Sequence, residues 1–432
     1  MASKKHRETL GDYFTLQRGT TYKSRLLDQP GPILLGLSTI QRNGGFRLDS
    51  LRTYGGQSPD TLLVQPGELY VSLKDVTQSA DLLGAVARLP FDRRAGRLTQ
   101  DTVKLQPIGN DVPTDYLYWL LRTPKYRSYC RAHATGTTNL GLAREDFLAF
   151  PAPEPSATQR AIAHILGTLD DKIELNRRMN ETLETIARAI FKSWFVDFDP
   201  VRAKAEGRDP GLPEHIADLF PDRFEGSEMG EIPVGWKVGT LGEVAENPRR
   251  TIKPAQMEES TTYIGLEHMP RQSICLADWD HADGLESNKY EFKRGEILFG
   301  KLRPYFHKVG IAPVDGICST DILVVAVKQP EWFGFVLEHV SSEGFVNHTT
   351  ATSSGTKMPR TNWKDMSGFS VVTPPFSLAK AFDELIQPFM ERIVENVHEG
   401  RSLTAIRDAL LPRLISGDLR VPDASRSIEV GL

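Results

Sequence analysis

The chain has 432 residues, 25% of them charged, and a formal net charge of −4 at pH 7. This length predicts two or three domains, each able to bury its own core. The charge balance excludes a protein that coats nucleic acid through overall positive charge, but a local basic surface would still suffice for DNA binding. Three widely spaced cysteines indicate no disulfide framework, and no run is apolar enough for a signal peptide or membrane span. We therefore expect a cytoplasmic protein without membrane contact.

The sequence contains an internal repeat. The matched positions keep their order along the chain: Leu10 with Leu241, Leu35 with Ile264, Gly67 with Gly295, and Gly136 with Gly355. The offset falls from 231 to 219 between the first and last pair, as expected if the first copy carries about a dozen extra loop residues. A long helical stretch follows each copy. Two such halves can fold with an internal pseudo-two-fold axis, which suits a partner with a two-fold backbone such as duplex DNA.

The first copy predicts a mixed unit of strands, loops and few helices. From Leu10 to about Phe150 the apolar runs are short and broken by Gly, Pro and Asn, with one helix expected around Tyr116 to Tyr129. The proline-rich stretch Pro151–Pro155 then ends this unit.

A capping-box pattern, Ser156 with Gln159, predicts a long helix to about Trp194. Its apolar stripe has coiled-coil spacing and is made by Ile162, Leu166, Leu169, Ile173, Leu183, Ile186 and Ile190. Asn176 and Asn180 interrupt the stripe. These asparagines are either simply solvated, or they fix the register of one long helix on the other, as a buried asparagine can do.

The second half repeats this plan after a linker. Residues 197–230, rich in Pro, Gly and charge, predict a long ordered linker. A second globular unit is expected from Ile232 to Val372, followed by a helix from about Ser377. Pro388 is expected to kink this helix or delay its start, and Gly417 to end it.

Two motifs resemble catalytic sites but fail on context. Gly295–Lys301 has the spacing GxxxxGK, but Leu302 stands where Ser or Thr would hold magnesium, and the central residues favour a buried strand. Thr373–Phe376 resembles the loop that holds the target amine in adenine methyltransferases, but its first residue is wrong and no Gly-rich turn precedes it, so we interpret it as a hinge before the helix. Histidine spacing indicates no metal site. We predict neither catalytic nor metal-binding residues.

What remains is basic, aromatic and hydroxyl-rich loop chemistry. Residues 289–308 carry six Lys or Arg against two Glu, and residues 122–131 are basic without any acid. The small polar loop Thr135–Asn139, matched by Ser353–Arg360, suits close approach to phosphates or base edges, although plain turns explain its glycines equally well. The residues predicted to bind DNA are Arg42, Lys74, Thr137, Thr138, Asn139, Lys301, Arg303, Tyr305, Lys308, Thr356, Lys357 and Arg360.

The whole chain resembles the specificity subunits of type I restriction-modification systems. The segments that carry the resemblance are Ile232–Val244, Gly295–Tyr305, Ser156–Phe198 and Ala409–Leu419. The resemblance implies an α/β fold: two target-recognition domains of mixed α/β type, separated by two long antiparallel coiled-coil helices. The implied boundaries are 1–154 and 231–374 for the recognition domains, 155–200 and 375–432 for the helical spacer regions, and 201–230 for the linker.

The resemblance also implies a function without catalysis. Each domain would read one half of a bipartite target in double-stranded DNA, while the helices set the spacer and dock two modification (methyltransferase) subunits. S-adenosylmethionine, ATP and magnesium would belong to these partners and to motor-nuclease restriction subunits, and no cofactor to this chain. The residues predicted to form the spacer and partner-helix contacts are Ile162, Leu166, Leu169, Ile173, Asn176, Leu183, Ile393, Asn396, Leu403 and Ile406.

The length of the first helix fits a spacer role. At about 1.5 Å per residue, the run from Ser156 to about Ser193 spans roughly 55 Å, against about 34–36 Å per turn of B-DNA. Half-sites about one to one and a half turns apart are therefore within reach.

Other functions remain open from the sequence. The chain could serve another phage-defence methylation system, which only neighbouring genes would reveal. It could be a scaffold whose globular units bind protein, which salt-dependent DNA binding would exclude. An enzyme with a degenerate site is the third alternative, and turnover by the purified chain would favour it.

Overall fold

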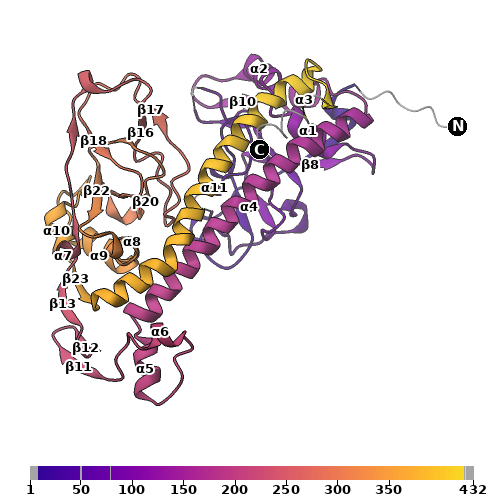
Figure 1. Ribbon diagram of the computed structural model, residues 1–432. Helices are drawn as coiled ribbons and strands as arrows, with labels where there is room; N and C mark the ends of the chain where they lie inside the picture. Colours follow the sequence, from indigo (N-terminus) through magenta and orange to yellow (C-terminus); the bar gives the residue numbers. More distant parts are fainter. Residues whose placement is uncertain (1–7, 49–50, 78, 423, 425–432) are drawn as a thin grey trace. The chain divides into compact units, whose positions relative to one another are not determined.

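The computed structural model describes residues 8–48, 51–77, 79–422 and 424. It divides into two compact units (Figure 1). The first unit comprises residues 1–171 and 403–432, and the second comprises residues 172–402. In the part of the chain that is described, no helix combines the length and the apolar character needed to cross a membrane.

The first unit contains three small sheets; the one made by β5, β10 and β9 is described below with the candidate site, and the other two are as follows. One is antiparallel with the order β1-β8-β4-β6, and the other has the order β2-β7-β3 with β2 and β7 parallel. The strands are β1 (Phe14–Arg18), β2 (Ile33–Leu35), β3 (Leu63–Val64), β4 (Leu69–Ser72), β6 (Val86–Arg88), β7 (Gly96–Leu98) and β8 (Thr102–Pro107). All four residues of β4 are buried, because this strand lies between two others.

The second unit repeats the strand order of both of these sheets and adds β15 and β17 at the edges of the second one. Its order β14-β22-β19-β20 corresponds to β1-β8-β4-β6, and the parallel pair β16-β21 beside β18 corresponds to β2-β7 beside β3. The strands are β14 (Ala245–Glu246), β15 (Thr251–Ile252), β16 (Thr262–Ile264), β17 (Asp280–His281), β18 (Lys289–Phe292), β19 (Ile297–Gly300), β20 (Val309–Ile311), β21 (Gly316–Cys318) and β22 (Ile322–Val327). The internal repeat predicted from the sequence is confirmed. The GxxxxGK segment forms the buried strand β19, as its residues indicated.

Short helices complete both units in matching order. They are α1 (Thr114–Leu120), α2 (Pro124–Ala132) and α3 (Arg144–Leu148) in the first unit, and α8 (Phe333–Val340), α9 (Glu343–Ala351) and α10 (Trp363–Ser367) in the second. The prediction of one helix around Tyr116 to Tyr129 is wrong, because the helix breaks between α1 and α2. Thr123 is the N-cap of α2, because its hydroxyl accepts a hydrogen bond from the Tyr126 N–H at 3.3 Å. Pro124 is the first residue of α2.

The segment expected as a linker contains several elements of its own. They are α5 (Asp199–Ala205), α6 (Glu214–Ala217), β11 (Phe224–Ser227) and β12 (Gly230–Pro233). Val201 and Phe220 from this segment are buried in the core of the second unit. β13 (Lys237–Thr240) follows, then α7 (Leu241–Val244), and β13 pairs with β23 (Ser370–Thr373).

Two long helices run through the fold, α4 (Ala157–Phe195) and α11 (Phe376–Ser416). The predicted capping box is present, because Ser156 and Gln159 exchange hydrogen bonds at 3.2 Å in both directions. Gly417, at φ +85°, follows the last residue of α11, as expected for a helix stop. Pro388 does not delay α11. Because proline has no backbone N–H, the carbonyl of Glu384 lacks its helical hydrogen bond. Both residues lie on the exposed side of the helix, where water can bond to this carbonyl.

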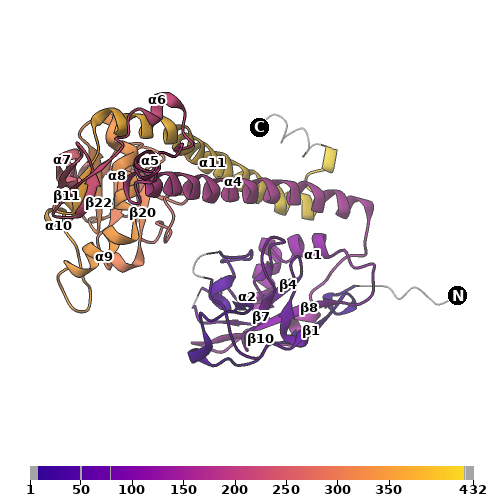
Figure 2. The ribbon, with the colours of Figure 1, turned by 90° about the horizontal axis from the view of Figure 1, so that it is seen from below.

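The two helices pair antiparallel within each unit and lie side by side (Figure 1; Figure 2). In the first unit, Nη1 of Arg407 lies 2.5 Å from Oδ1 of Asp170. In the second unit, Nδ2 of Asn396 donates to Oδ1 of Asn180 at 2.8 Å. Within the second unit Asn176 bonds to Glu399 and Asn180 to Asn396, so the position on α11 falls as the position on α4 rises, which makes the pair antiparallel as predicted.

The buried stripe of α4 follows the prediction only in part. Ile162, Leu166 and Leu169 are buried, Ile173 and Leu183 are partly buried, and on α11 Ile393 and Leu403 are buried and Ile406 is partly buried. Ile186 is 41% exposed, so its placement in the stripe is wrong. From Asn176 onward the buried positions of α4 are Asn176, Asn180, Glu184, Ala187, Phe191, Trp194 and Phe195. The stripe shifts because a straight helix of 3.6 residues per turn drifts relative to a heptad pattern.

The asparagines of the helix pair are buried, so the expectation that they are simply solvated is wrong. Asn176, Asn180 and Asn396 are 2%, 4% and 2% exposed. The Nδ2 of Asn176 donates to Oε2 of Glu399 at 2.7 Å, and the amide of Asn396 bonds to Asn180. A buried polar layer therefore joins α4 to α11 in the second unit.

Candidate nucleic-acid interface

A β-hairpin projects a polar loop from the first unit. Its strands are β9 (Ala134–Thr135) and β10 (Leu140–Leu142), and β10 also pairs with β5 (Lys74–Asp75), with Gly141 opposite Lys74. Gly136 has φ +93°, and a Cβ there would lie 2.5 Å from the carbonyl oxygen of Asn139, so the tight loop requires glycine.

The hairpin brings several predicted residues of the first unit together. Thr137, Thr138 and Asn139 are all exposed in its loop, and Lys74 is exposed on the strand beside it. The Nζ of Lys74 lies 3.5 Å from Oδ1 of Asp101. This edge of the unit therefore presents hydroxyl, amide and ammonium groups on one three-stranded sheet.

Asp75 organises the loop that follows β5. It is fully buried, and its carboxylate accepts hydrogen bonds from the backbone N–H groups of Thr77 and Leu82, both at 2.6 Å, and of Leu83 at 3.1 Å. Arg42 is exposed in a turn that is tied to the same loop, since the next residue, Asn43, donates its N–H to the carbonyl of Asp81 at 2.8 Å.

The second unit builds the same hairpin from the matching residues. Ser354 and Arg360 exchange backbone hydrogen bonds at 3.0 and 2.9 Å, and Arg360 also forms a bridge with Leu302, which follows β19. Gly355 has φ +98°, as Gly136 does in the first hairpin. Thr356 and Lys357 are exposed in the loop. The repeat therefore extends to the geometry of the two loops.

The basic residues near the second hairpin differ in how they are engaged. The Lys308 ammonium donates to the carbonyl oxygen of Leu266, and Nε of Arg360 pairs with Asp321 at 2.9 Å. Among the described residues, Lys301 and Lys357 form no ion pair. Lys301 and Lys357 are therefore the lysines of this region best placed to meet an outside anion.

Arg303 and Tyr305 lie in the turn that follows β19. Nη2 of Arg303 is 3.4 Å from the carbonyl oxygen of Lys357, and its backbone N–H donates to Pro359 at 2.7 Å, so the turn and the hairpin are joined. Tyr305 is 52% exposed, with its ring edge-on to Phe306. The turn thus presents an aromatic and a cationic side chain beside the hairpin.

The structure adds one basic residue that we had not predicted. Arg271 is exposed, and its guanidinium lies 4.2 Å from the ring centroid of Phe306. The repeat could have revealed it, because the offset that matches Leu35 to Ile264 also matches Arg42 to Arg271. Charge counting along 289–308 missed it because the residue comes from a distant segment.

Other basic residues that the sequence suggested are internal. Arg127 is 3% exposed and donates to the carbonyl oxygens of Leu83 and Ala80 at 2.6 and 2.9 Å. Lys289 is 5% exposed, and its ammonium donates to Ser287. Counting basic residues in the sequence therefore overestimated the exposed basic surface of segments 122–131 and 289–308.

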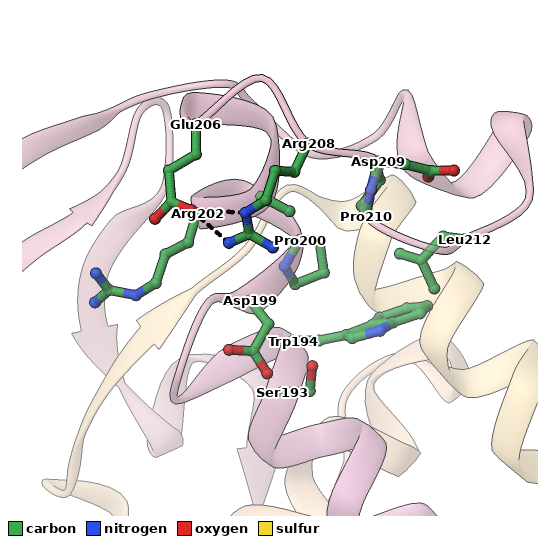
Figure 3. Close-up of a pocket in the computed structure, with 11 residues that line it drawn as sticks. Ser193, Trp194, Asp199, Pro200, Arg202, Glu206, Arg208, Asp209, Pro210 and Leu212 are labelled. Atoms are coloured by element: carbon green, nitrogen blue, oxygen red, sulfur yellow. Dashed lines mark hydrogen bonds and ion pairs between the residues drawn. The ribbon is translucent and has the colours of Figure 1, made fainter.

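A cavity of about 280 Å³ lies in the second unit, where α4 meets α5, and no hairpin residue lines it (Figure 3). Its charged side chains engage one another, because Nε of Arg208 donates to Oε2 of Glu206 at 2.7 Å. Trp194, which also lines it, is 3% exposed and belongs to the core. Within the described part of the chain, no group of three or more His, Cys, Asp or Glu side chains is placed to hold a metal.

Comparison with known proteins finds relatives of one kind. No model of a protein family matches the chain. The MjaIX specificity subunit of a type I restriction enzyme from Methanocaldococcus jannaschii is 26% identical, over 72% of this chain and 70% of the relative. The HindI subunit from Haemophilus influenzae (73% and 79%) and the EcoDI subunit from Escherichia coli (81% and 76%) are also 26% identical.

A solved structure shows the same fold. The S subunit of a type I restriction-modification system from M. genitalium superposes with a TM-score of 0.53 at 16% identity, over 96% of this chain and 97% of that one. The repeated α/β units and the antiparallel helix pair agree with this likeness. Over most of its length the chain is similar to specificity subunits of type I restriction-modification systems.

Proposed function

We propose that the chain is the DNA-recognition subunit of a methylating complex and that each unit reads one half of a split target. The observation that carries this proposal is the repeated hairpin, which in both units projects exposed polar side chains beside a basic residue. Side chains of this kind supply both phosphate contacts and base contacts in protein–DNA interfaces.

The two hairpins offer different chemistry. The loop of the first unit presents Thr137, Thr138 and Asn139, and an asparagine amide can bond an adenine at two positions in the major groove. The loop of the second unit presents Lys357, with Lys301 directly after the neighbouring strand β19, and both suit phosphate contacts. The proposed target is therefore asymmetric, with unlike half-sites.

The helix pair has two roles in this proposal. Its continuous helices set the distance between the half-sites, and its outer face docks modification subunits. Support for docking comes from α4 in the second unit, where Leu175 and Ile186, about three helical turns apart, are 45% and 41% exposed. Exposed apolar residues at helical spacing suit a partner surface of complementary shape.

The chemistry belongs to the partners. Two modification subunits would supply S-adenosylmethionine and methylate adenine, and restriction subunits would add ATP- and magnesium-dependent translocation and cleavage. This chain contributes sequence recognition and spacing, and no catalytic step passes through its residues.

Salt-dependent binding of duplex DNA by the complex with modification subunits tests the recognition role. The logarithm of the binding constant should fall linearly with the logarithm of salt concentration, and Lys301→Ala and Lys357→Ala should each reduce the slope by about one. Lys293→Ala is the matched control, because this exposed ammonium lies 3.3 Å from Asp315. Binding that is insensitive to salt, or unchanged by both lysine variants, would contradict the proposal.

A further inference from the structure

Arg271 is an arginine that is held in place without being neutralised. Its guanidinium stacks on Phe306 at 4.2 Å, and among the described residues its side chain forms no hydrogen bond or ion pair. An exposed arginine ordinarily samples many rotamers and loses this freedom when it binds a ligand. Stacking on an aromatic ring restricts the side chain beforehand, so less conformational entropy is lost on binding.

The backbone around this stack is fixed in an uncommon conformation. Gln272, Arg303 and His307 all have positive φ, at 57°, 51° and 51°. The Gln272 N–H donates to the His307 carbonyl at 2.9 Å, which ties the Arg271 segment to the turn that carries Phe306. Non-glycine residues with positive φ are strained, and such strain is concentrated at functional sites.

The stack lies next to the hairpin of the second unit. Arg303, at the start of the same turn, bonds through its backbone to Pro359 at 2.7 Å and through Nη2 to the Lys357 carbonyl at 3.4 Å. Arg271 therefore belongs to the same surface as the exposed loop residues Thr356 and Lys357.

The repeat marks this position as special. Arg42 is the counterpart of Arg271, and the residue after each has positive φ, at 63° for Asn43 and 57° for Gln272. Each of these following residues also donates its N–H to a neighbouring loop, at 2.8 and 2.9 Å. No aromatic ring is recorded beneath the Arg42 guanidinium among the described residues, so the stack distinguishes the second unit.

We propose that Arg271, held on Phe306, reads a guanine in the half of the target bound by the second unit. The planar guanidinium matches the O6 and N7 acceptors of guanine in the major groove, and a fixed orientation is what such a two-point contact requires. A phosphate contact needs only a positive charge nearby, so it would gain little from the stacking and the constrained backbone. The inference rests on the proposed function and names the base read by one of its two sites.

The test maps adenine methylation in hosts that carry the complete complex with wild-type, Arg271→Ala or Arg271→Lys chains. Both variants should lose about 5- to 150-fold of the preference for guanine at one position, the discrimination that a bidentate pair supplies. Lysine should fail as alanine does, because its single ammonium cannot make the forked contact. Phe306→Leu, which retains the arginine but removes the ring, should weaken the same preference less.

Two controls separate base reading from general effects. Arg42→Ala changes the matching arginine of the other unit and should leave that guanine position intact. Arg392→Ala removes an exposed arginine of α11 that pairs with Glu395 at 3.2 Å, and should leave the whole motif intact. An unchanged motif in Arg271→Ala, or a uniform loss of methylation at all sites, would overturn the inference. If the wild-type chain directed no split motif at all, the proposed function itself would fail.

Discussion

Glu338 and Glu184 are carboxyl groups in the interior of the second unit. Glu338 lies on α8 and is 4% exposed, and burial raises its pKa to about 7. Burial also raises the pKa of Glu184, although its carboxylate accepts hydrogen bonds from the Ser273 hydroxyl at 2.8 Å and the Ile274 N–H at 3.2 Å. A buried acid with a raised pKa keeps its proton in the folded state over a range where the unfolded chain has lost it.

Glu338→Gln should therefore change how stability depends on pH. Between pH 4.5 and about 7 the folded wild-type protein binds more protons than the unfolded chain, so its stability falls as pH rises. The variant lacks this titration, so its free energy of unfolding should rise relative to that of wild type by up to about 3 kcal/mol across that interval. Burial lowers the pKa of the neighbouring His339 to about 3, so this histidine makes stability rise with pH. The effect is the same in wild type and in the variant, and it cancels in their difference.

Urea unfolding of the second unit at pH 4.5, 6 and 7.5 measures this difference. Glu395→Gln, at an exposed position of α11, is the control for replacing a glutamate by a glutamine. A stability difference between Glu338→Gln and wild type that stays constant with pH would show that Glu338 titrates normally.

At the scale of elements, the polar layer between α4 and α11 links the two helices chemically. Asn180 uses both ends of its amide, accepting from Asn396 at 2.8 Å and donating to the Ile393 carbonyl at 3.4 Å. Apolar side chains would pack at many registers, whereas a buried amide pair is satisfied at one. The layer therefore favours a single register of the pair in the second unit.

Replacing one asparagine of this pair should lower the stability by more than half of what replacing both lowers it. Asn396→Leu leaves the buried Oδ1 of Asn180 without its partner and should destabilise the second unit by about 1–3 kcal/mol. The double variant with Asn180→Leu restores an apolar contact, so the two effects should be coupled by at least about 0.5 kcal/mol. A double-mutant cycle by urea unfolding measures the coupling, and simple additivity would exclude this role for the layer.

The order of the elements was predictable from the sequence, but which basic side chains are exposed and unpaired was not. The repeat anticipated the matched sheets and the two hairpin glycines, Gly136 and Gly355, because turns and strand patterns are local features. The sequence could not reveal that Lys308 bonds to a backbone carbonyl or that Arg127 is internal, since both depend on distant segments. Arg271 was missed for the same reason.

At the scale of the whole molecule, the helices α4 and α11 should act as a ruler between half-sites. Four residues inserted in each helix, after Asp171 and after Ser402, would lengthen the pair by about 6 Å. That length is close to two base pairs at about 3.4 Å each. We expect the methylated motif to keep both half-sequences and to gain about two base pairs of spacer.

Methylome sequencing of hosts carrying the insertion variant measures the spacer directly. The control is a four-residue insertion in the loop after Gly207, which lies outside both long helices. This insertion should leave the spacer of the methylated motif unchanged. Recognition of only the original spacer by the helix variant would contradict the ruler.

The most direct test of the account is the methylome of a host that carries this chain with its modification subunits, compared with the same host after deletion of the chain. The account predicts adenine methylation at a split, asymmetric motif that disappears on deletion. Methylation that is the same in both hosts would contradict the claim that this chain selects the DNA sequence.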